Sequence, residues 1–164
     1  MRKIIAALQV SLDGFIEGSN GELDWVGTWD DSFDDMFPQI DTCILGRGMY
    51  PGYEQYWLAI LANPDGTLPF TGKVAWKTTR IVRDVEEIRN MKQHSGKDIY
   101  AVGGATLVSS LMTLGLIDEF RLVVHPIVLG GGKALFKDVK ERHALKLLGA
   151  KPLKSGMVCL TYST

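Results

Sequence analysis

Short, mostly apolar runs recur along the chain, and runs of this kind are typical of buried strands. We expect strands over residues 3–10, 41–45, 79–83, 98–102 and 120–129. The first of these runs ends at Ser-Leu-Asp-Gly, and the residues that follow it, up to 28, carry several glycines and resemble a loop. Two further runs, over residues 144–151 and 157–162, surround a turn at Lys154, Ser155 and Gly156 and are expected to pair antiparallel.

Apolar residues at helical spacing lie between several of the expected strands. Residues 85–94 place Ile88 and Met91 on one side. Gly115 suits the C-terminal cap of a helix over residues 106–114, whose apolar face comprises Leu107, Val108, Leu111, Met112 and Leu114. Another helix is expected over residues 53–62.

A shorter helix is expected over residues 30–37, where acidic residues and Ser32 suit the first turn. Phe33, Met36 and Phe37 would share one face. Pro38 would end the helix.

Strands alternate with helices for two-thirds of the chain, and strands alone follow. This order predicts an α/β fold with a mainly parallel central sheet, flanked by helices and extended by antiparallel C-terminal strands. The length of 164 residues suits a single domain over residues 1–164.

Composition excludes several classes of function. Lys and Arg number 18 and Asp and Glu 19, a net charge of −1 that gives no support to nucleic-acid binding. No stretch approaches the roughly 20 apolar residues of a membrane span, and the run at residues 4–10 is too short for a typical signal peptide. Cys43 and Cys159 lack C-x-x-C spacing and are expected in the core, which favours a cytoplasmic protein.

Motifs of other enzyme classes are missing from the sequence. The three histidines, His94, His125 and His143, share no ligand spacing, so no metal is expected. Neither G-x-S-x-G nor a P-loop occurs, so hydrolase and kinase activities have no support.

Glycines follow two of the expected strands directly. Gly46 follows residues 41–45, and Gly103 and Gly104 follow residues 98–102. Ligands of open α/β sheets bind outside the carboxyl ends of the strands, where glycine lets a phosphate approach the backbone at a helix N-terminus. The pattern is not G-x-G-x-x-G, and a tight turn with close packing explains the glycines equally well.

Arg47, directly after Gly46, favours the phosphate interpretation. A guanidinium group recognises phosphate in bidentate fashion, although an isolated arginine is more often a solvated surface residue. Asp13, after the first strand, is either a functional acid beside a reacting ring or, more commonly, a turn residue. One of Asp30, Asp31, Asp34 and Asp35 is a further candidate proton donor beside Phe33 and Phe37.

Five motifs in order give the chain a recognisable resemblance. They are residues 3–16, ending Ser-Leu-Asp-Gly-Phe-Ile; Cys-Ile-Leu-Gly-Arg-Gly-Met-Tyr at 43–50; Gly-Lys-Asp-Ile-Tyr-Ala-Val-Gly-Gly at 96–104; Gly-Leu-Ile-Asp-Glu at 115–119; and Pro-Ile-Val-Leu-Gly-Gly-Gly-Lys-Ala-Leu-Phe at 126–136. The chain resembles the dihydrofolate reductase-like superfamily over nearly its whole length. More narrowly, it resembles the reductase domain of the bifunctional riboflavin-biosynthesis deaminase/reductase and its small stand-alone relatives.

The resemblance implies an NADPH-dependent reductase that transfers hydride to a small pterin-like or pyrimidine-like heterocycle. By the same resemblance, Gly46 and Arg47 would meet the 2′-phosphate side of NADPH. The remaining cofactor-binding residues would be Ser11, Leu12, Gly14, Val102, Gly103, Gly104, Ala105, Thr106 and Leu107, and Asp13 would be the catalytic residue.

The chain departs from the family pattern at two places. Met49 stands where relatives often have Thr or Ser, so one hydroxyl contact to phosphate is missing. Between Lys73 and Val74, relatives carry a further strand and loop; either the gene has lost it or the sequence joins residues across an omitted segment. Losing a central strand would expose two sheet edges.

These departures keep other functions open. One is a catalytically silent nucleotide-binding protein on the same scaffold. Another is true dihydrofolate reduction, which needs an acid buried on the first helix, with Asp31, Asp34 and Asp35 as the alternatives. A homodimer is expected if the apolar face of Val123, Val124, Ile127 and Val128 meets a twofold partner rather than the core.

Overall fold

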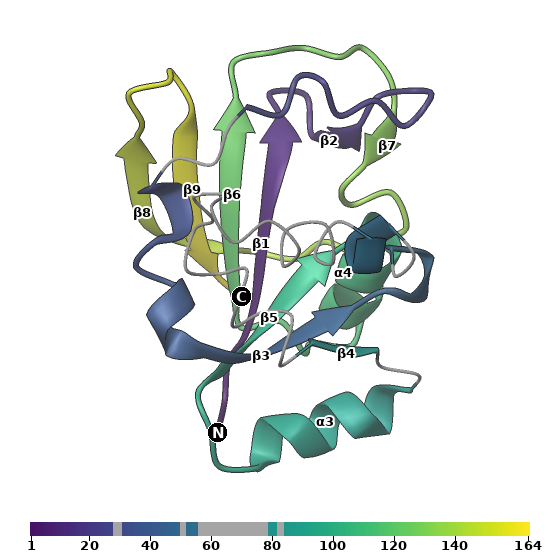
Figure 1. The fold of residues 1–164 in the computed structure, drawn as a ribbon, viewed down its shortest axis with the longest axis vertical. Helices are drawn as coiled ribbons and strands as arrows, with labels where there is room; N and C mark the ends of the chain where they lie inside the picture. Colours follow the sequence, from purple (N-terminus) through teal and green to yellow (C-terminus); the bar gives the residue numbers. More distant parts are fainter. Residues whose placement is uncertain (28–30, 50–51, 56–78, 82–83) are drawn as a thin grey trace.

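The computed structural model describes residues 1–27, 31–49, 52–55, 79–81 and 84–164. Within them, seven strands form one sheet in the order β4-β3-β5-β1-β6-β9-β8 (Figure 1). The strand bounds are β1 Ile4–Ser11, β3 Ile40–Leu45, β4 Thr79–Ile81, β5 Asp98–Gly103, β6 Glu119–His125, β8 Lys146–Pro152 and β9 Val158–Ser163.

The sheet is parallel from β4 to β6 and antiparallel beyond it. This arrangement confirms the predicted α/β fold. Parallel strands of one sheet need crossover connections, and helices supply two of them. Helix α3 (Val85–Gln93) links β4 to β5, and α4 (Ala105–Thr113) links β5 to β6. Among the described helices, none is long and apolar enough to cross a membrane.

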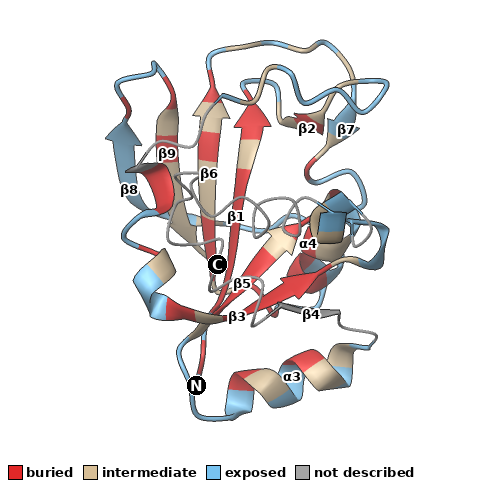
Figure 2. Ribbon diagram, viewed as in Figure 1, coloured by how far each residue is buried: buried red, intermediate tan, exposed pale blue. Residues whose placement is uncertain are grey.

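Strand β1 is the most deeply buried strand of the sheet (Figure 2). Ile4, Ala6 and Leu8 pack on one face with α4 residues such as Val108 and Leu111. Each fully buried aliphatic side chain of this size contributes roughly 1.5–3 kcal/mol of hydrophobic free energy. Burial on both faces explains why the sequence of a parallel strand is continuously apolar rather than alternating.

The opposite face of β1 is covered by a segment predicted to be helical. Residues 30–37 form no α-helix in their described part; the structure has 3-10 turns at Asp31–Phe33 and Phe37–Gln39. Pro38 lies inside the second turn, where its missing N–H and its restriction of the preceding residue oppose a regular helix. The predicted apolar face is nevertheless correct, because Phe33 and Met36 are buried against Ile5.

A small second sheet was not predicted. Strand β2 (Phe15–Glu17), inside the segment expected to be a loop, pairs antiparallel with β7 (Lys133–Ala134), which follows the three glycines at 130–132. Gly132 has φ +139° and lies directly against the Glu17 carbonyl, where a side chain would collide. This position requires glycine to bring the two loops together.

The region around the expected missing strand is only partly described. The junction of Lys73 and Val74 lies outside the described residues, as does most of the helix expected over 53–62. Strand β4 pairs directly with β3, and β5 pairs with the other side of β3. Strand β4 therefore stands at the end of the described sheet, and the lost strand stays a prediction.

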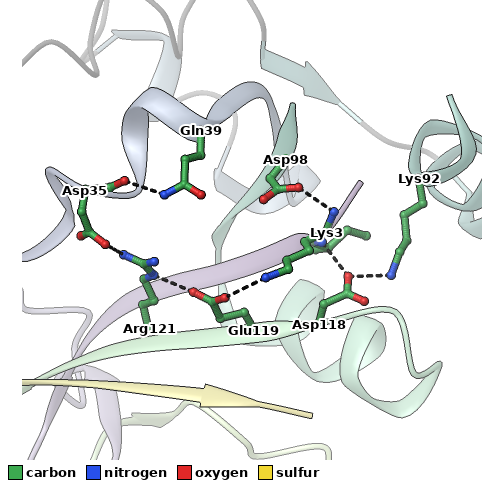
Figure 3. A network of polar contacts seen from close by, with 9 residues as sticks. Lys3, Asp35, Gln39, Lys92, Asp98, Asp118, Glu119 and Arg121 are labelled. Atoms are coloured by element: carbon green, nitrogen blue, oxygen red, sulfur yellow. Dashed lines mark hydrogen bonds and ion pairs between the residues drawn. The ribbon is translucent and has the colours of Figure 1, made fainter. Parts of the chain in front are cut away.

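Ion pairs gather at the amino ends of the parallel strands (Figure 3). Arg121 of β6 donates to Glu119 Oε1 (2.7 Å) and to Asp35 Oδ2 (2.7 Å), which joins the 31–39 segment to the sheet. Lys3 donates its backbone N–H to Asp98 Oδ1 (2.8 Å), and its ammonium group lies 3.6 Å from Glu119 Oε2. The carboxylates thus connect β1, β5 and β6 where these strands begin.

Lys92 is the most buried cation of this region, with only 6% of the residue exposed. Its Nζ donates to Asp118 Oδ2 (2.6 Å) and to the Leu116 carbonyl (2.9 Å). The same Asp118 oxygen accepts the backbone N–H of Ile4 (2.7 Å). Lys92 therefore ties α3 to the first residue of β1 and to the turn before β6.

Replacing Lys92 with methionine should lower the free energy of unfolding by about 2–3 kcal/mol. The substitution keeps the side-chain length but leaves Asp118 and the Leu116 carbonyl without their shared donor, and hydrogen bonds to charged groups are worth about 1.5–3 kcal/mol. Urea unfolding measures the loss, with the exposed Lys140→Met as the matched control. Equal stability of the two variants would contradict this role for Lys92.

Candidate functional site

The predicted site residues meet at one edge of the sheet. Strands β1, β3, β5 and β6 are parallel, so all four end at the same edge of the sheet (Figure 1). Their last residues are Ser11, Leu45, Gly103 and His125. Ligands of open parallel sheets bind at this carboxyl edge. The structure thus places three segments that are far apart in sequence at the same edge of the sheet: residues 11–14, 46–49 and 102–107.

Glycines make the closest approach between these segments. The Gly46 backbone N–H donates to the Gly103 carbonyl (3.3 Å), although the bond is long. A side chain at Gly46 would lie 3.4 Å from both the Gly103 oxygen and Leu107 Cβ. Gly103 has φ +120°, a conformation that favours glycine, and the peptide bond joining it to Gly104 is cis. The two strand ends therefore present bare backbone side by side.

Helix α4 begins directly at this glycine pair. Gly104 is its N-cap and has no side chain to satisfy the first N–H groups of the helix. The first bond from the helix to its cap is from Val108 N to the Gly104 carbonyl (3.2 Å). Ala105 is buried, whereas Thr106 is exposed at the edge. The N–H groups of residues 105–107 and the helix dipole together favour an anion here.

Arg47 and Met49 lie on a 3-10 turn, Arg47–Met49, directly after Gly46. Arg47 is exposed and, among the described residues, makes no hydrogen bond or ion pair. The Met49 sulfur lies over the glycine pair, 3.7 Å and 3.5 Å from where the Cβ atoms of Gly103 and Gly104 would be. The Met49 side chain thus covers the bare backbone of Gly103 and Gly104.

The first loop is shaped by a serine hydroxyl. Ser11 is buried; its Oγ accepts the Phe15 N–H (2.9 Å) and donates to Asp13 Oδ1 (2.7 Å). Gly14 has φ +87° and donates its N–H to the Ser11 carbonyl (3.0 Å). Leu12 is 66% exposed, at the tip of the loop. The turn thus forms as expected, but Ser11 rather than Asp13 closes it.

Asp13 instead connects two loops. Its Oδ1 accepts the Leu129 N–H (3.1 Å) and its Oδ2 the Gly130 N–H (2.8 Å). The Ser11 hydroxyl and these backbone donors lower the pKa of Asp13, against a smaller raising effect of burial. A carboxylate with this set of donors is an ionised acceptor near neutral pH, which suits positioning better than proton donation. Its catalytic role stays a prediction.

The acidic residues of the 31–39 segment give no buried acid in their described part. Asp34 and Asp35 are exposed, and Asp35 is paired with Arg121 near the start of β6, away from the glycine edge. The side chain of Asp31 and the whole of Asp30 lie outside the described residues. Within the described part of the chain, no three His, Cys, Asp or Glu residues are grouped as a metal site would need.

Sequence reasoning missed a polar cluster at the same edge. His125, only 4% exposed, ends β6, and its Nε2 lies 2.5 Å from Gln9 Oε1 of β1. Trp25 packs its ring edge against His125, with centroids 5.2 Å apart. A signal was present in Gln9, an amide inside an otherwise apolar strand, but the pairing depends on the register of β1 and β6.

Comparison with known proteins identifies the family. The model of the RibD C-terminal domain matches residues 70–159, more than half of the chain. The chain belongs to the RibD C-terminal domain family. The uncharacterised protein YyaP of Bacillus subtilis is 41% identical to it, with 98% of this chain and 94% of YyaP aligned. That alignment spans 183 positions against the 164 residues here, so YyaP has residues without a counterpart in this RibD-like chain.

Solved structures with a similar fold include two reductases. A deaminase/5-amino-6-(5-phosphoribosylamino)uracil reductase from Thermotoga maritima matches with a TM-score of 0.67 and 14% identity, over 99% of this chain and 56% of that one. A dihydrofolate reductase from Enterococcus faecalis complexed with NADP(H) matches with a TM-score of 0.58 and 14% identity, over 98% and 95%. These likenesses confirm the fold.

Replacing Asp13 with alanine should accelerate hydrogen exchange at the Leu129 and Gly130 amides severalfold, because both lose their acceptor. NMR-detected exchange measures the effect, and Asp24→Ala, an exposed aspartate of the same loop region, is the control. Because the pKa of Asp13 is lowered, the contact persists as pH falls below its ordinary value of 3.8 and is lost only at the lower folded pKa. Unchanged exchange in the Asp13 variant would exclude the contact.

Proposed function

We propose that this RibD-like chain is an NADPH-dependent oxidoreductase. Residues 1–164 would form one reductase domain that transfers hydride to a small pterin-like or pyrimidine-like heterocycle in the cytoplasm. The observation that carries the proposal is the bare backbone of Gly46, Gly103 and Gly104 at the start of α4, with Arg47 beside it. Family membership and the reductase neighbours support the reaction class.

The glycine edge fits the phosphates of a dinucleotide. A Cβ at Gly46 would lie 3.4 Å from the Gly103 carbonyl oxygen, so glycine leaves the backbone between the two strand ends uncovered. The N–H groups of Ala105, Thr106 and Leu107 would receive phosphate oxygens, and the exposed guanidinium of Arg47 would meet a further phosphate. A phosphate on the ribose is what distinguishes NADPH from NADH, so Arg47 would determine this preference.

Met49 is compatible with a ligand at the glycines only if its side chain moves. Methionine has three rotatable side-chain bonds and adapts readily, and Met49 is 37% exposed on its outer side. Movement of its thioether would uncover Gly103 and Gly104. Met49 therefore lowers the expected affinity without closing the site.

The chain's own residues would orient the reactants rather than react with them. The bound nicotinamide supplies the hydride, as the cofactor of such enzymes does. The Ser11 loop, with Leu12 and Gly14, would lie beside the ring, and Asp13 would hold that loop against residues 129–130. The role of Asp13 would thus be to keep the 11–14 loop in place.

A silent nucleotide-binding protein is the second candidate. Two observations favour it: Met49 covers the glycines, and Asp13, the predicted catalytic acid, is held ionised by Ser11 and two backbone donors. Such a protein would bind NADPH without transferring hydride.

Replacing Arg47 with methionine should raise the Kd for NADPH about tenfold to a hundredfold. The estimate follows from the roughly 1.5–3 kcal/mol of a hydrogen bond to a charged group. Fluorescence titration measures it, and Arg142→Met, an exposed arginine outside the site, is the control. The Kd for NADH, which lacks the ribose phosphate, should change little.

Three outcomes separate the candidates. Absence of NADPH binding by the unaltered protein would refute both. Binding that depends on Arg47, with oxidation of NADPH when heterocycles are added, supports the reductase. Binding that depends on Arg47, without turnover across oxidised pterins and pyrimidines, supports the silent protein.

A further inference from the structure

Gln9 is a polar residue in the middle of a buried strand. Among the residues of β1, its neighbours on the same face are Ile5 and Ala7, which belong to the core on that side. Gln9 itself is half-buried, near the carboxyl end of the strand. An amide here loses water on folding and must be matched by hydrogen-bonding partners.

His125 supplies one of these partners. It is two positions beyond Val123, the β6 residue opposite Gln9, and it shares the same face of the sheet. Its Nε2 lies 2.5 Å from Gln9 Oε1. A carboxamide oxygen only accepts, so His125 donates Nε2–H to it, and the imidazole carries its proton on Nε2.

This bond occupies only the oxygen of the carboxamide. Gln9 Nε2 has two N–H groups, and no hydrogen bond from them occurs among the described residues. Because the oxygen is fixed by His125, the amide cannot rotate to present its acceptor instead. Gln9, near the carboxyl end of β1, is thus left with two N–H donors to offer to a ligand.

Trp25 keeps the imidazole in place. The two rings meet edge-on at 89° with centroids 5.2 Å apart, and the Trp25 Nε1–H donates to the Glu22 carbonyl (3.2 Å). Gly27 of the same loop lies close to the ring, since a Cβ there would be 3.9 Å from His125 Cε1. The 22–27 loop covers His125, and half-buried Trp25 adds an apolar surface beside the imidazole.

We propose that Gln9 is a specificity-determining residue, which donates its carboxamide N–H to a ring carbonyl of a flat heterocycle. His125 is its positioning residue, and Trp25 forms an apolar wall of the same site. The inference rests on the proposed reductase function, because β1 lies between β5, which ends at Gly103, and β6, which ends at His125. The substrate class is therefore a heterocycle with an amide-type carbonyl at its edge.

The test compares two rings of equal size with the NADP⁺-loaded protein. 5-Aminouracil carries ring carbonyls, and aniline has no acceptor in its ring. The unaltered protein should bind 5-aminouracil at least tenfold more tightly, and the Gln9 side-chain NH₂ resonances should shift as it binds. NMR titration reports both, and NADP⁺ affinity is measured separately for every variant.

Gln9→Leu should remove the preference for 5-aminouracil and leave NADP⁺ affinity unchanged, whereas Gln93→Leu, at the exposed end of α3, should change neither. Gln9→Glu keeps the acceptor and loses the donors, so it should behave like Gln9→Leu. His125→Phe should weaken the preference and alter the Gln9 NH₂ resonances. His125→Asn, which can still donate to Gln9 Oε1, should restore them.

The results separate this inference from the proposed function. Equal affinity for the two rings, failure to bind 5-aminouracil, or a preference that survives Gln9→Leu would overturn the role of Gln9, even if NADP⁺ binds normally. Absence of NADP⁺ binding would refute the cofactor assignment, and the ring preference is then measured on the protein alone. If His125→Phe lowers stability only and leaves the Gln9 resonances unchanged, His125 is structural and the positioning role is wrong.

Discussion

The parallel pairing of β1 between β5 and β6 is the constraint on which the rest of the structure depends. Side chains alternate along a strand, so the register that sets Ile4 opposite Ile99 and Ser11 opposite His125 decides which residues face each core. Ile4, Ala6 and Leu8 then pack toward α4, and Ile5 and Ala7 toward the 31–39 segment. A slip of one residue would exchange these faces and separate Gln9 from His125.

The two ends of the parallel strands have different chemistry, and this separates stability from function. Carboxylates and cations connect the amino ends, where Asp118 joins Lys92 to the first residue of β1. Glycines, a helix N-terminus and an exposed arginine occupy the carboxyl ends. Removing an ion pair at one end should therefore change unfolding, whereas changes at Arg47 or Gln9 should change what is bound.

The sequence alone predicts the parts of this chain that depend on local pattern. The apolar runs at 3–10 and 98–102 and the capped helix before Gly115 all correspond to observed elements. The α-helix expected over 30–37 was wrong because the same spacing of apolar residues fits an α-helix and two successive 3-10 turns. Pro38 favours the turns. The β2–β7 pair, the Asp13 contacts with residues 129–130 and the Gln9–His125 pair join residues more than 100 positions apart, and no local pattern records such pairings.

Membership of the RibD C-terminal domain family establishes a reductase-like scaffold, and the proposed function assigns a dinucleotide to its glycine edge. The most direct measurement of this assignment is a two-dimensional ¹H–¹⁵N NMR titration with NADP⁺. Binding at the proposed site predicts that the largest amide shifts occur at residues 11–14, 46–49 and 102–107, with little change around Asp118 and Lys92. Shifts centred on the amino ends of the strands or on β8, or no shifts at all, would contradict it.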